Sequence, residues 1–89
     1  MPLYNILFHR SVKKYVDKLD SITKSRLRKA VDELAENPIP PASIKVEGYR
    51  DQKIRRLRVG DHRILYVVDL QEKEVIIVKI DKRGRVYKR

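Results

Sequence analysis

The chain has 89 residues, of which 22 are Lys or Arg, 12 are Asp or Glu and none is cysteine, so its formal net charge is +10. The length fits one domain spanning residues 1–89, and the lack of cysteine excludes disulfides, thiolate catalysis and cysteine-bound metal clusters. Such an excess of positive charge favours a polyanion or an acidic protein as the partner.

The positive charge is unevenly distributed along the chain. Residues 1–44 contain eight cations and five anions, a net charge of +3, whereas residues 45–89 contain fourteen cations and seven anions, a net charge of +7. We therefore expect a site for a polyanion mainly in the second half of the chain.

The N-terminal stretch MPLYNILFHR is predicted to form the first strand. Its apolar run is far shorter than the roughly 20 residues that a membrane-spanning helix needs. It also lacks the cationic start and the small-residue cleavage site of a signal peptide. We therefore expect a cytoplasmic protein.

Two helices are predicted next. Apolar residues from Ser11 to Leu19 recur with the spacing i, i+3, i+4, i+7, which places them on one face of a short helix. The same spacing continues in a second helix, which residues 20–21 can cap. That helix is expected to end at Asn37, because the residue before a proline is disfavoured in the α conformation.

Three β signals follow a proline-rich connector that has room for one short strand around residues 44–46. Residues 54–59, 62–69 and 74–80 are rich in Val, Ile, Leu and Tyr, and the short links between them imply an antiparallel meander. The sequence thus predicts an α+β domain: an N-terminal strand and a two-helix hairpin packed on a mostly antiparallel sheet that the C-terminal three-stranded meander completes. The expected core residues are Leu3, Ile6, Val12, Val16, Leu19, Leu27, Val31, Leu34, Leu57, Ile64, Tyr66, Val68, Ile76, Val78 and Ile80.

Most catalytic motifs are absent from the sequence. It contains no GxGxxG, no GxxxxGK[ST] and no HExxH, and its two histidines, His9 and His62, lack the spacing of metal ligands. We therefore expect the protein to use neither a metal nor a cofactor.

A cationic set remains as the candidate site. Alternation along residues 54–59 places Arg56 and Arg58 on one face of their strand, and the meander brings Arg58 and the end of strand 74–80 close to Arg63. Arginines held in this way can bind a phosphate through paired hydrogen bonds and offset charge that develops on phosphorus. RNA could then be cut without a metal, because it carries its own nucleophile, the 2′-hydroxyl. The full set is Lys53, Arg55, Arg56, Arg58, Arg63, Lys82, Arg83, Arg85 and Tyr87.

The same residues also permit roles without catalysis. A basic strand with a basic tail is more often a solvated surface or a docking surface for an acidic partner, and Tyr87 can pack over the edge of the sheet rather than stack on a base or exchange a proton. Arg63 begins an otherwise apolar strand, so it needs either a ligand or a carboxylate partner, for which Asp61 and Asp81 are candidates.

The segments LRVGDHRILYVVD, EVIIVKI and DKRGRVYKR, taken in this order, resemble the C-terminal half of the RelE/ParE toxin superfamily. FHRSVKKYVDKL and the following helix ending in ENP resemble its N-terminal helical hairpin, so the resemblance spans nearly the whole chain. It is strongest to the RelE-like mRNA interferase toxins.

The resemblance implies a toxin that an antitoxin holds inactive. RelE-like members cleave mRNA in the ribosomal A site without a metal, whereas ParE-like members share the fold, act on DNA gyrase and usually lack the catalytic basic and tyrosine residues. The implied partners are a RelB-like antitoxin, in a hetero-oligomer with the toxin, and the ribosome with its mRNA. Two alternatives stay open: a ParE-like toxin without nuclease activity, and a basic binding module without toxicity.

The resemblance also assigns residues. It places the catalytic roles on Arg63, Arg83 and Tyr87, and RNA binding on Lys53, Arg56, Arg58 and Arg85. The sequence departs from the RelE pattern where Arg56-Leu57-Arg58 replaces a Lys-x-Lys pair. Arginine, unlike lysine, does not give up its proton in proteins, so these two residues can hold phosphate but are poor general bases. Lys53 and Tyr87 remain candidates for the base.

Overall fold

The chain folds in the order of elements that its sequence predicts. The computed structural model describes residues 3–46 and 53–82. The elements are β1 (Asn5–Phe8), α1 (Arg10–Asp17), α2 (Ser21–Glu36), β2 (Ile44–Lys45), β3 (Ile54–Val59), β4 (His62–Asp69) and β5 (Glu74–Lys82).

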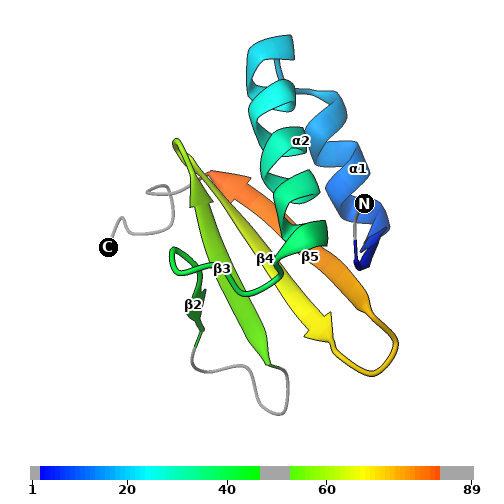
Figure 1. The fold of residues 1–89 in the computed structure, drawn as a ribbon. Coiled ribbons are helices and arrows are strands. Elements are labelled where there is room, and N and C mark those ends of the chain that lie inside the picture. Colours follow the sequence, from blue (N-terminus) through cyan, green and yellow to red (C-terminus); the bar gives the residue numbers. More distant parts are fainter. Residues whose placement is uncertain (1–2, 47–52, 83–89) are drawn as a thin grey trace.

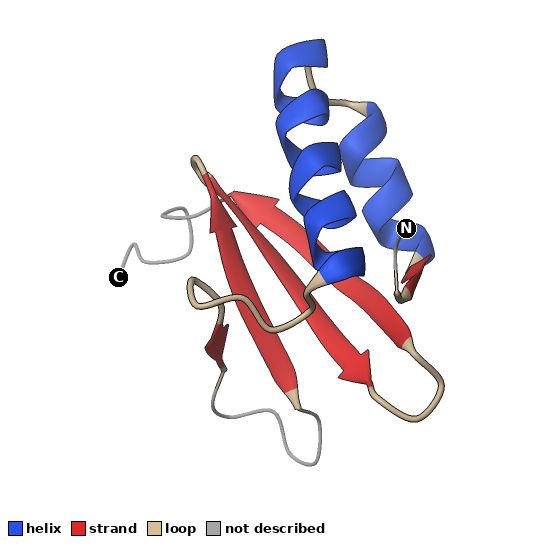
Figure 2. Cartoon of the chain, viewed as in Figure 1, coloured by secondary structure: helices blue, strands red, loops and turns tan. Residues whose placement is uncertain are grey.

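The strands form one mixed sheet in the order β1-β5-β4-β3-β2. β3, β4 and β5 make the expected antiparallel meander, β2 pairs antiparallel with β3, and β1 pairs parallel with β5 at the far edge. The two helices form a hairpin that covers one face of this sheet (Figures 1 and 2). In residues 3–46 and 53–82 no helix covers the other face, which we call the open face. The α+β architecture predicted from the sequence is confirmed.

Polar side chains cap the N-termini of both helices. The ring Nδ1 of His9 accepts a hydrogen bond from the Ser11 backbone N–H at 3.1 Å, and the Asp20 carboxylate accepts one from the Thr23 N–H at 3.4 Å. These bonds satisfy backbone donors that have no partner within the helix. Neither helix is long and apolar enough to cross a membrane.

The core lies between the helices and the covered face of the sheet. Tyr66, at the centre of β4, is fully buried, and its hydroxyl donates a hydrogen bond to the Pro38 carbonyl at 2.8 Å. This bond ties the end of α2 to the middle of the sheet. The other buried members of this cluster are Val12, Leu27, Val31, Leu34, Ile64, Val75, Ile77 and Ile80.

The predicted core is wrong at three positions. Leu3 precedes β1, is 64% exposed and does not belong to the core cluster, although its backbone N–H donates to the Ala35 carbonyl of α2 at 3.0 Å. On β5 the residues facing the helices are Val75 and Ile77 rather than the predicted Ile76 and Val78. A β-bulge explains the difference: Leu65 pairs with Lys79 and Tyr66 with Ile77, so Val78 is unpaired and the alternation of faces is reset.

The turn between β3 and β4 consists of Gly60 and Asp61. Gly60 has φ +60°, a left-handed conformation that glycine adopts without steric cost and that two-residue hairpins require. This tight turn sets the register that pairs Val59 with His62 and Arg58 with Arg63.

Candidate functional site

Three charged residues lie side by side across the open face, next to the Gly60-Asp61 turn. Arg58 on β3 is paired with Arg63 on β4, which is paired in turn with Asp81 on β5. Paired residues project from the same face of a sheet. Since the neighbouring residue Ile64 belongs to the core beneath the helices, these three residues project from the open face. We call them the Arg63 row.

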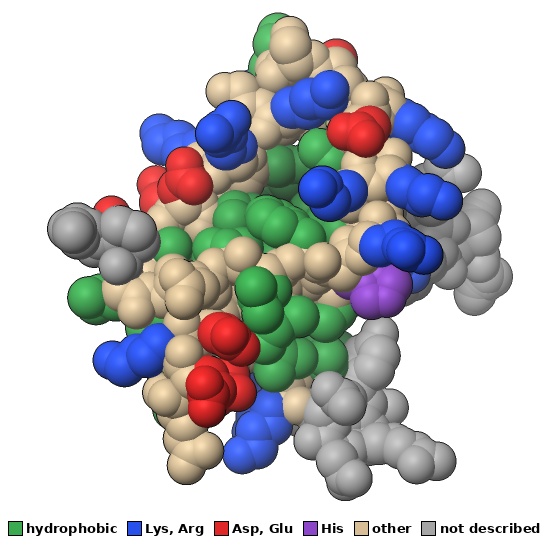
Figure 3. Space-filling view, turned by 90° about the vertical axis from the view of Figure 1, so that its right-hand side faces the viewer, with side chains coloured by type: hydrophobic (Ala, Val, Ile, Leu, Met, Phe, Trp, Pro, Cys, Tyr) green, Lys and Arg blue, Asp and Glu red, His purple; other side chains and the backbone are tan. Residues whose placement is uncertain are grey.

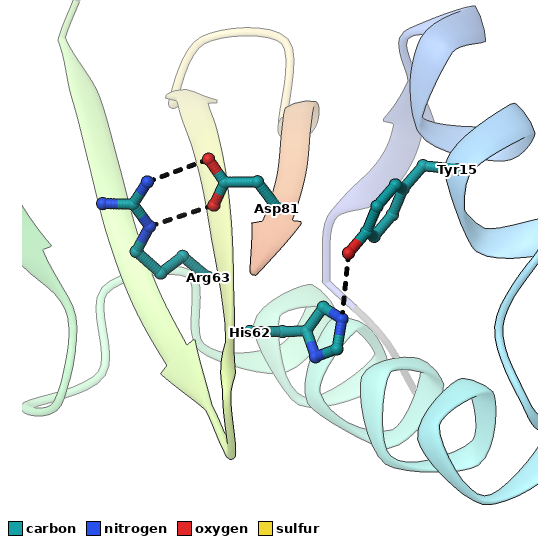
Figure 4. Close-up of polar contacts among 4 residues, drawn as sticks. All are labelled: Tyr15, His62, Arg63 and Asp81. Carbon is teal, nitrogen blue, oxygen red and sulfur yellow. Dashed lines mark hydrogen bonds and ion pairs between the residues drawn. The ribbon is translucent and has the colours of Figure 1, made fainter. Parts of the chain in front are cut away.

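Arg63 forms a bidentate ion pair with Asp81. Its Nε donates to Oδ1 at 3.0 Å and its Nη2 to Oδ2 at 2.8 Å (Figure 4). The two side chains are only 13% and 21% exposed, and the paired hydrogen bonds offset the cost of removing the guanidinium from water. Of the two carboxylates considered from the sequence, Asp81 is therefore the partner of Arg63. The pair holds the guanidinium in one orientation.

A second row extends the positive charge along the open face. Arg56 and Lys79 lie on either side of Leu65, one on β3 and the other on β5. Arg56 is half-buried and Lys79 is exposed. This row has two cations and no carboxylate, so a polyanion on the open face would meet positive charge on three adjacent strands. Sequence reasoning did not single out Lys79, although a lone cation within the apolar run VIIVKI was a signal.

Two other basic residues, Arg55 in β3 and Lys53 just before it, do not belong to these rows. Lys53 precedes β3 and lies five residues before Arg58, about 16 Å away along an extended chain. Arg55 projects from the helix-covered face, where its Nε donates to the Ser43 hydroxyl at 3.1 Å and its Nη2 to the Ser43 carbonyl at 3.3 Å. Arg55 thus anchors the connector before β2 and is structural.

The remaining predicted site residues follow β5. Arg83, Arg85 and Tyr87 lie outside the described residues. The strand that leads to them ends at Lys82, which is paired with His62, one position along from the pair of Asp81 with Arg63. The expectation that the chain leaves the sheet beside Arg63 is therefore confirmed as far as Lys82.

A further polar cluster, on the helix-covered face, was not found from the sequence. His62 is 8% exposed, its Nε2 is 3.1 Å from the Tyr15 hydroxyl, and the two rings pack edge to face at 5.9 Å (Figure 4). His62 and Arg63 are adjacent on β4 and so project from opposite faces of the sheet. Helical periodicity places half-buried Tyr15 on the inner face of α1 but does not indicate which strand residue it will contact, so the sequence did not link Tyr15 to His62.

Positive charge also covers the outer side of the helices. Figure 3 shows Lys and Arg side chains gathered over the helices, with hydrophobic surface beneath them. At the sheet edge formed by β1, Leu7 and Phe8 are 44% and 47% exposed. The exposed cations of α1 are Arg10, Lys13 and Lys14.

The chain matches a known protein family over most of its length. Residues 6–87 match the family described as "ParE toxin of type II toxin-antitoxin system, parDE". A protein named RelE1 from Methanocaldococcus jannaschii is 28% identical over 86 residues, which cover 96% of each chain.

Solved structures of RelE toxins have the same fold. RelE in the RelE–RelB complex of Pyrococcus horikoshii OT3 superposes with a TM-score of 0.82 at 32% identity, over 94% of this chain and 99% of that one. The isolated RelE toxin of E. coli gives a TM-score of 0.73 at 27% identity, over 94% of this chain and 88% of that one. The chain therefore belongs to the RelE/ParE superfamily of toxins from type II toxin–antitoxin modules and is a RelE-like toxin.

Proposed function

We propose that this toxin is a metal-independent endoribonuclease that cleaves mRNA in the ribosomal A site and thereby inhibits translation. The observation that carries the proposal is the Arg63 row: two arginines on adjacent strands, one of them oriented by a carboxylate, at the end of the sheet from which β5 leads to Arg83. Arg58 is exposed, so it can bind a phosphodiester through paired hydrogen bonds. Arg63, whose Nε and Nη2 donate to Asp81, contributes positive charge held in a fixed orientation.

The proposed reaction uses the nucleophile that RNA supplies. The 2′-hydroxyl attacks the neighbouring phosphorus, the bond from phosphorus to the 5′-oxygen breaks, and the products are a 2′,3′-cyclic phosphate and a 5′-hydroxyl. The 2′-hydroxyl loses its proton and the leaving 5′-oxygen gains one. In this scheme Arg63 and Arg83 stabilise the charge that develops on the phosphoryl oxygens.

Tyr87 is the proposed proton-transfer or base-stacking residue. Arginine is a poor general base, so Arg56 and Arg58 are assigned to holding RNA. Arg85 assists them. Lys53, about 16 Å from Arg58 along the strand, is assigned to a more distant RNA phosphate and not to proton transfer.

The proposed partner that restrains this activity is a RelB-like antitoxin. RelE of Pyrococcus horikoshii was solved in complex with RelB. For this chain we propose a toxin–antitoxin hetero-oligomer in which the antitoxin covers the open face, with acidic residues or with a helix laid along the sheet. The proposed location is the cytoplasm, where ribosomes translate mRNA and where the toxin would act once it is free of the antitoxin.

Induced expression followed by toeprinting of a translating mRNA tests the proposal. The wild-type toxin should arrest growth and produce ribosome-dependent cuts within codons. Arg83→Ala and Tyr87→Phe should abolish these cuts while the far-UV circular dichroism spectrum and antitoxin binding stay nearly unchanged. Lys29→Ala, which removes an exposed cation of α2, is the control and should cut like the wild type. An Arg83→Ala variant that unfolds would show that this arginine is structural.

A second candidate is a ParE-like toxin that acts on DNA gyrase, because the family that matches residues 6–87 carries the ParE description. The same experiment separates the two candidates. Growth arrest with intact mRNA and accumulating DNA breaks would favour gyrase as the target and reject the nuclease. Expression without any growth arrest would favour a basic binding module.

A further inference from the structure

A polar pocket of about 190 Å³ lies on the helix-covered face, beside the turn that joins β3 and β4. Its charged or titratable lining residues are Arg26, Asp61, His62 and Lys82, and Thr23 adds a hydroxyl. Liquid water occupies about 30 Å³ per molecule, so the pocket has room for roughly six waters or for one phosphate group with some of its hydration. We call it the turn pocket.

Three elements far apart in the sequence build the turn pocket. Arg26 comes from α2, Asp61 from the turn, and Lys82 from the last position of β5, where it is paired with His62. The α2 guanidinium approaches the turn closely: a Cβ placed on Gly60 would lie 3.8 Å from Nη1 of Arg26. That distance is an ordinary van der Waals contact, so what requires glycine at this position is the left-handed turn.

The Tyr15 hydrogen bond orients the His62 ring within this pocket. The Tyr15 hydroxyl lies 3.1 Å from Nε2. Because Nε2 faces this hydroxyl, Nδ1 is the ring nitrogen that can serve a ligand. Arg26 and Lys82 contribute two positive charges and Asp61 one negative charge, so the lining is cationic on balance.

We propose that the turn pocket binds a phosphate group of the RNA backbone, as a second anchor for the strand that the Arg63 row contacts. This inference rests on the proposed function. Arg26, Lys82 and His62 supply the donors. A larger hollow of about 370 Å³, lined by residues of β1, α2, β5 and one residue of α1, is less suited to a phosphate because its lining is mainly apolar.

RNA is the phosphate ligand that the position of the pocket favours. His62 and Arg63 are consecutive, and their cross-strand partners, Lys82 and Asp81, are consecutive too. The turn pocket and the Arg63 row therefore lie back to back on the two faces of one end of the sheet. An RNA strand that crosses the Gly60-Asp61 turn meets both. The pocket holds the strand and takes no part in the bond-breaking step.

Titration of the isotopically labelled toxin with inorganic phosphate, followed by NMR, tests the pocket without reference to cleavage. The Gly60 and Asp61 amide signals and the His62 ring signals should shift and saturate. Arg26→Gln should weaken binding about tenfold, because it removes charge-assisted hydrogen bonds. Asp61→Asn should strengthen it about threefold, because it removes the opposing charge. Arg28→Gln removes an α2 cation that does not line the pocket, so it is the matched control and should leave the titration unchanged.

Equal effects of Arg26→Gln and Arg28→Gln, or shifts confined to the Arg63 row, would overturn the assignment of the turn pocket. A second arm measures the binding of a single-stranded oligoribonucleotide as a function of salt. Arg26→Gln should reduce the log–log slope by roughly 0.7, the value for one phosphate contact. Phosphate binding in the pocket with an unchanged RNA slope would refute RNA as the ligand. RNA binding through the pocket without cleavage would leave this inference standing and refute the proposed nuclease.

Discussion

The helix-covered face and the open face of the sheet differ most clearly along β4. His62, Ile64 and Tyr66 project toward the helices and are buried in or beside the core, whereas Arg63, between the first two, projects from the open face and is paired with Asp81. Adjacent residues of β4 therefore lie in different environments, one beneath the helices and the next on the open face. We therefore expect that single substitutions along β4 can alter stability and the proposed polyanion binding separately.

The largest expected effect is the loss of the Tyr66 side chain. Tyr66→Ala removes a fully buried aromatic ring and should lower the free energy of unfolding by about 3–5 kcal/mol. Tyr66→Phe keeps the ring and leaves the Pro38 carbonyl without its donor, for an expected loss of about 1–3 kcal/mol. Urea unfolding followed by circular dichroism measures both variants. If Tyr66→Ala is as stable as the wild type, the helix-covered face does not determine stability.

The next effect concerns the partner of Arg63. Asp81→Ala leaves a guanidinium largely shielded from water without its carboxylate, and we expect a loss of about 1–3 kcal/mol. RNA cleavage should fall as well, because Arg63 is no longer held in one orientation. Asp32→Ala removes an exposed carboxylate of α2 and serves as the control, with a change within about 0.5 kcal/mol. Full cleavage by a folded Asp81→Ala variant would show that the orientation of Arg63 is unimportant.

A smaller loss of stability is expected on the helix-covered face, at the start of β4, where Tyr15 contacts His62. Tyr15→Phe removes the hydroxyl that bonds to Nε2 of His62 and keeps the edge-to-face ring contact. Its expected cost is about 1 kcal/mol, a typical value for a single hydrogen bond. The thermal unfolding midpoint, compared with that of a Tyr4→Phe control, measures this loss. An unchanged midpoint would indicate that water replaces the hydroxyl without cost.

Two arginines on opposite faces of β3, Arg58 and Arg55, provide a direct test of the two faces. Arg58→Gln, on the open face, should change stability by less than about 0.5 kcal/mol. It should also reduce the salt-dependence slope of single-stranded RNA binding by roughly 0.7. Arg55→Gln, on the helix-covered face, should have the reverse profile, since its guanidinium is bonded to Ser43. Identical profiles for the two variants would contradict the separation of the faces.

The smallest expected effect concerns Asp20, the N-cap of α2, which lies on neither face of the sheet. The hydrogen bond from Thr23 lowers the pKa of Asp20, the residue that caps α2, below its ordinary value of 3.8. A carboxyl with a lowered pKa in the folded state stabilises the fold fully above the unfolded value, and this contribution disappears as the pH falls from 3.8 through the lower folded pKa. Acid titration of the unfolding midpoint should therefore be shallower in Asp20→Ala than in the wild type. Parallel curves would show that the cap does not contribute.

Much of the fold could be predicted from the sequence because it depends on local patterns. The spacing i, i+3, i+4, i+7 located both helices, and the Gly60-Asp61 link predicted the hairpin that pairs Arg58 with Arg63. The inner face of β5 was predicted wrongly, since one bulged residue, Val78, shifts the alternation and appears in the sequence only as another apolar residue. The roles assigned to Arg83, Arg85 and Tyr87 remain predictions.

The elements, their order, the meander and the alternation that places Arg56 and Arg58 away from the helices follow from periodicity and turn chemistry, so they can be predicted from the sequence. Three contacts are visible only in the folded protein: Asp81 with Arg63, Arg55 with the connector, and Arg26 with Lys82 at the turn pocket. Each of these contacts joins residues that are separated along the chain. Their proximity depends on strand register and on the docking of the helices, which no local pattern encodes.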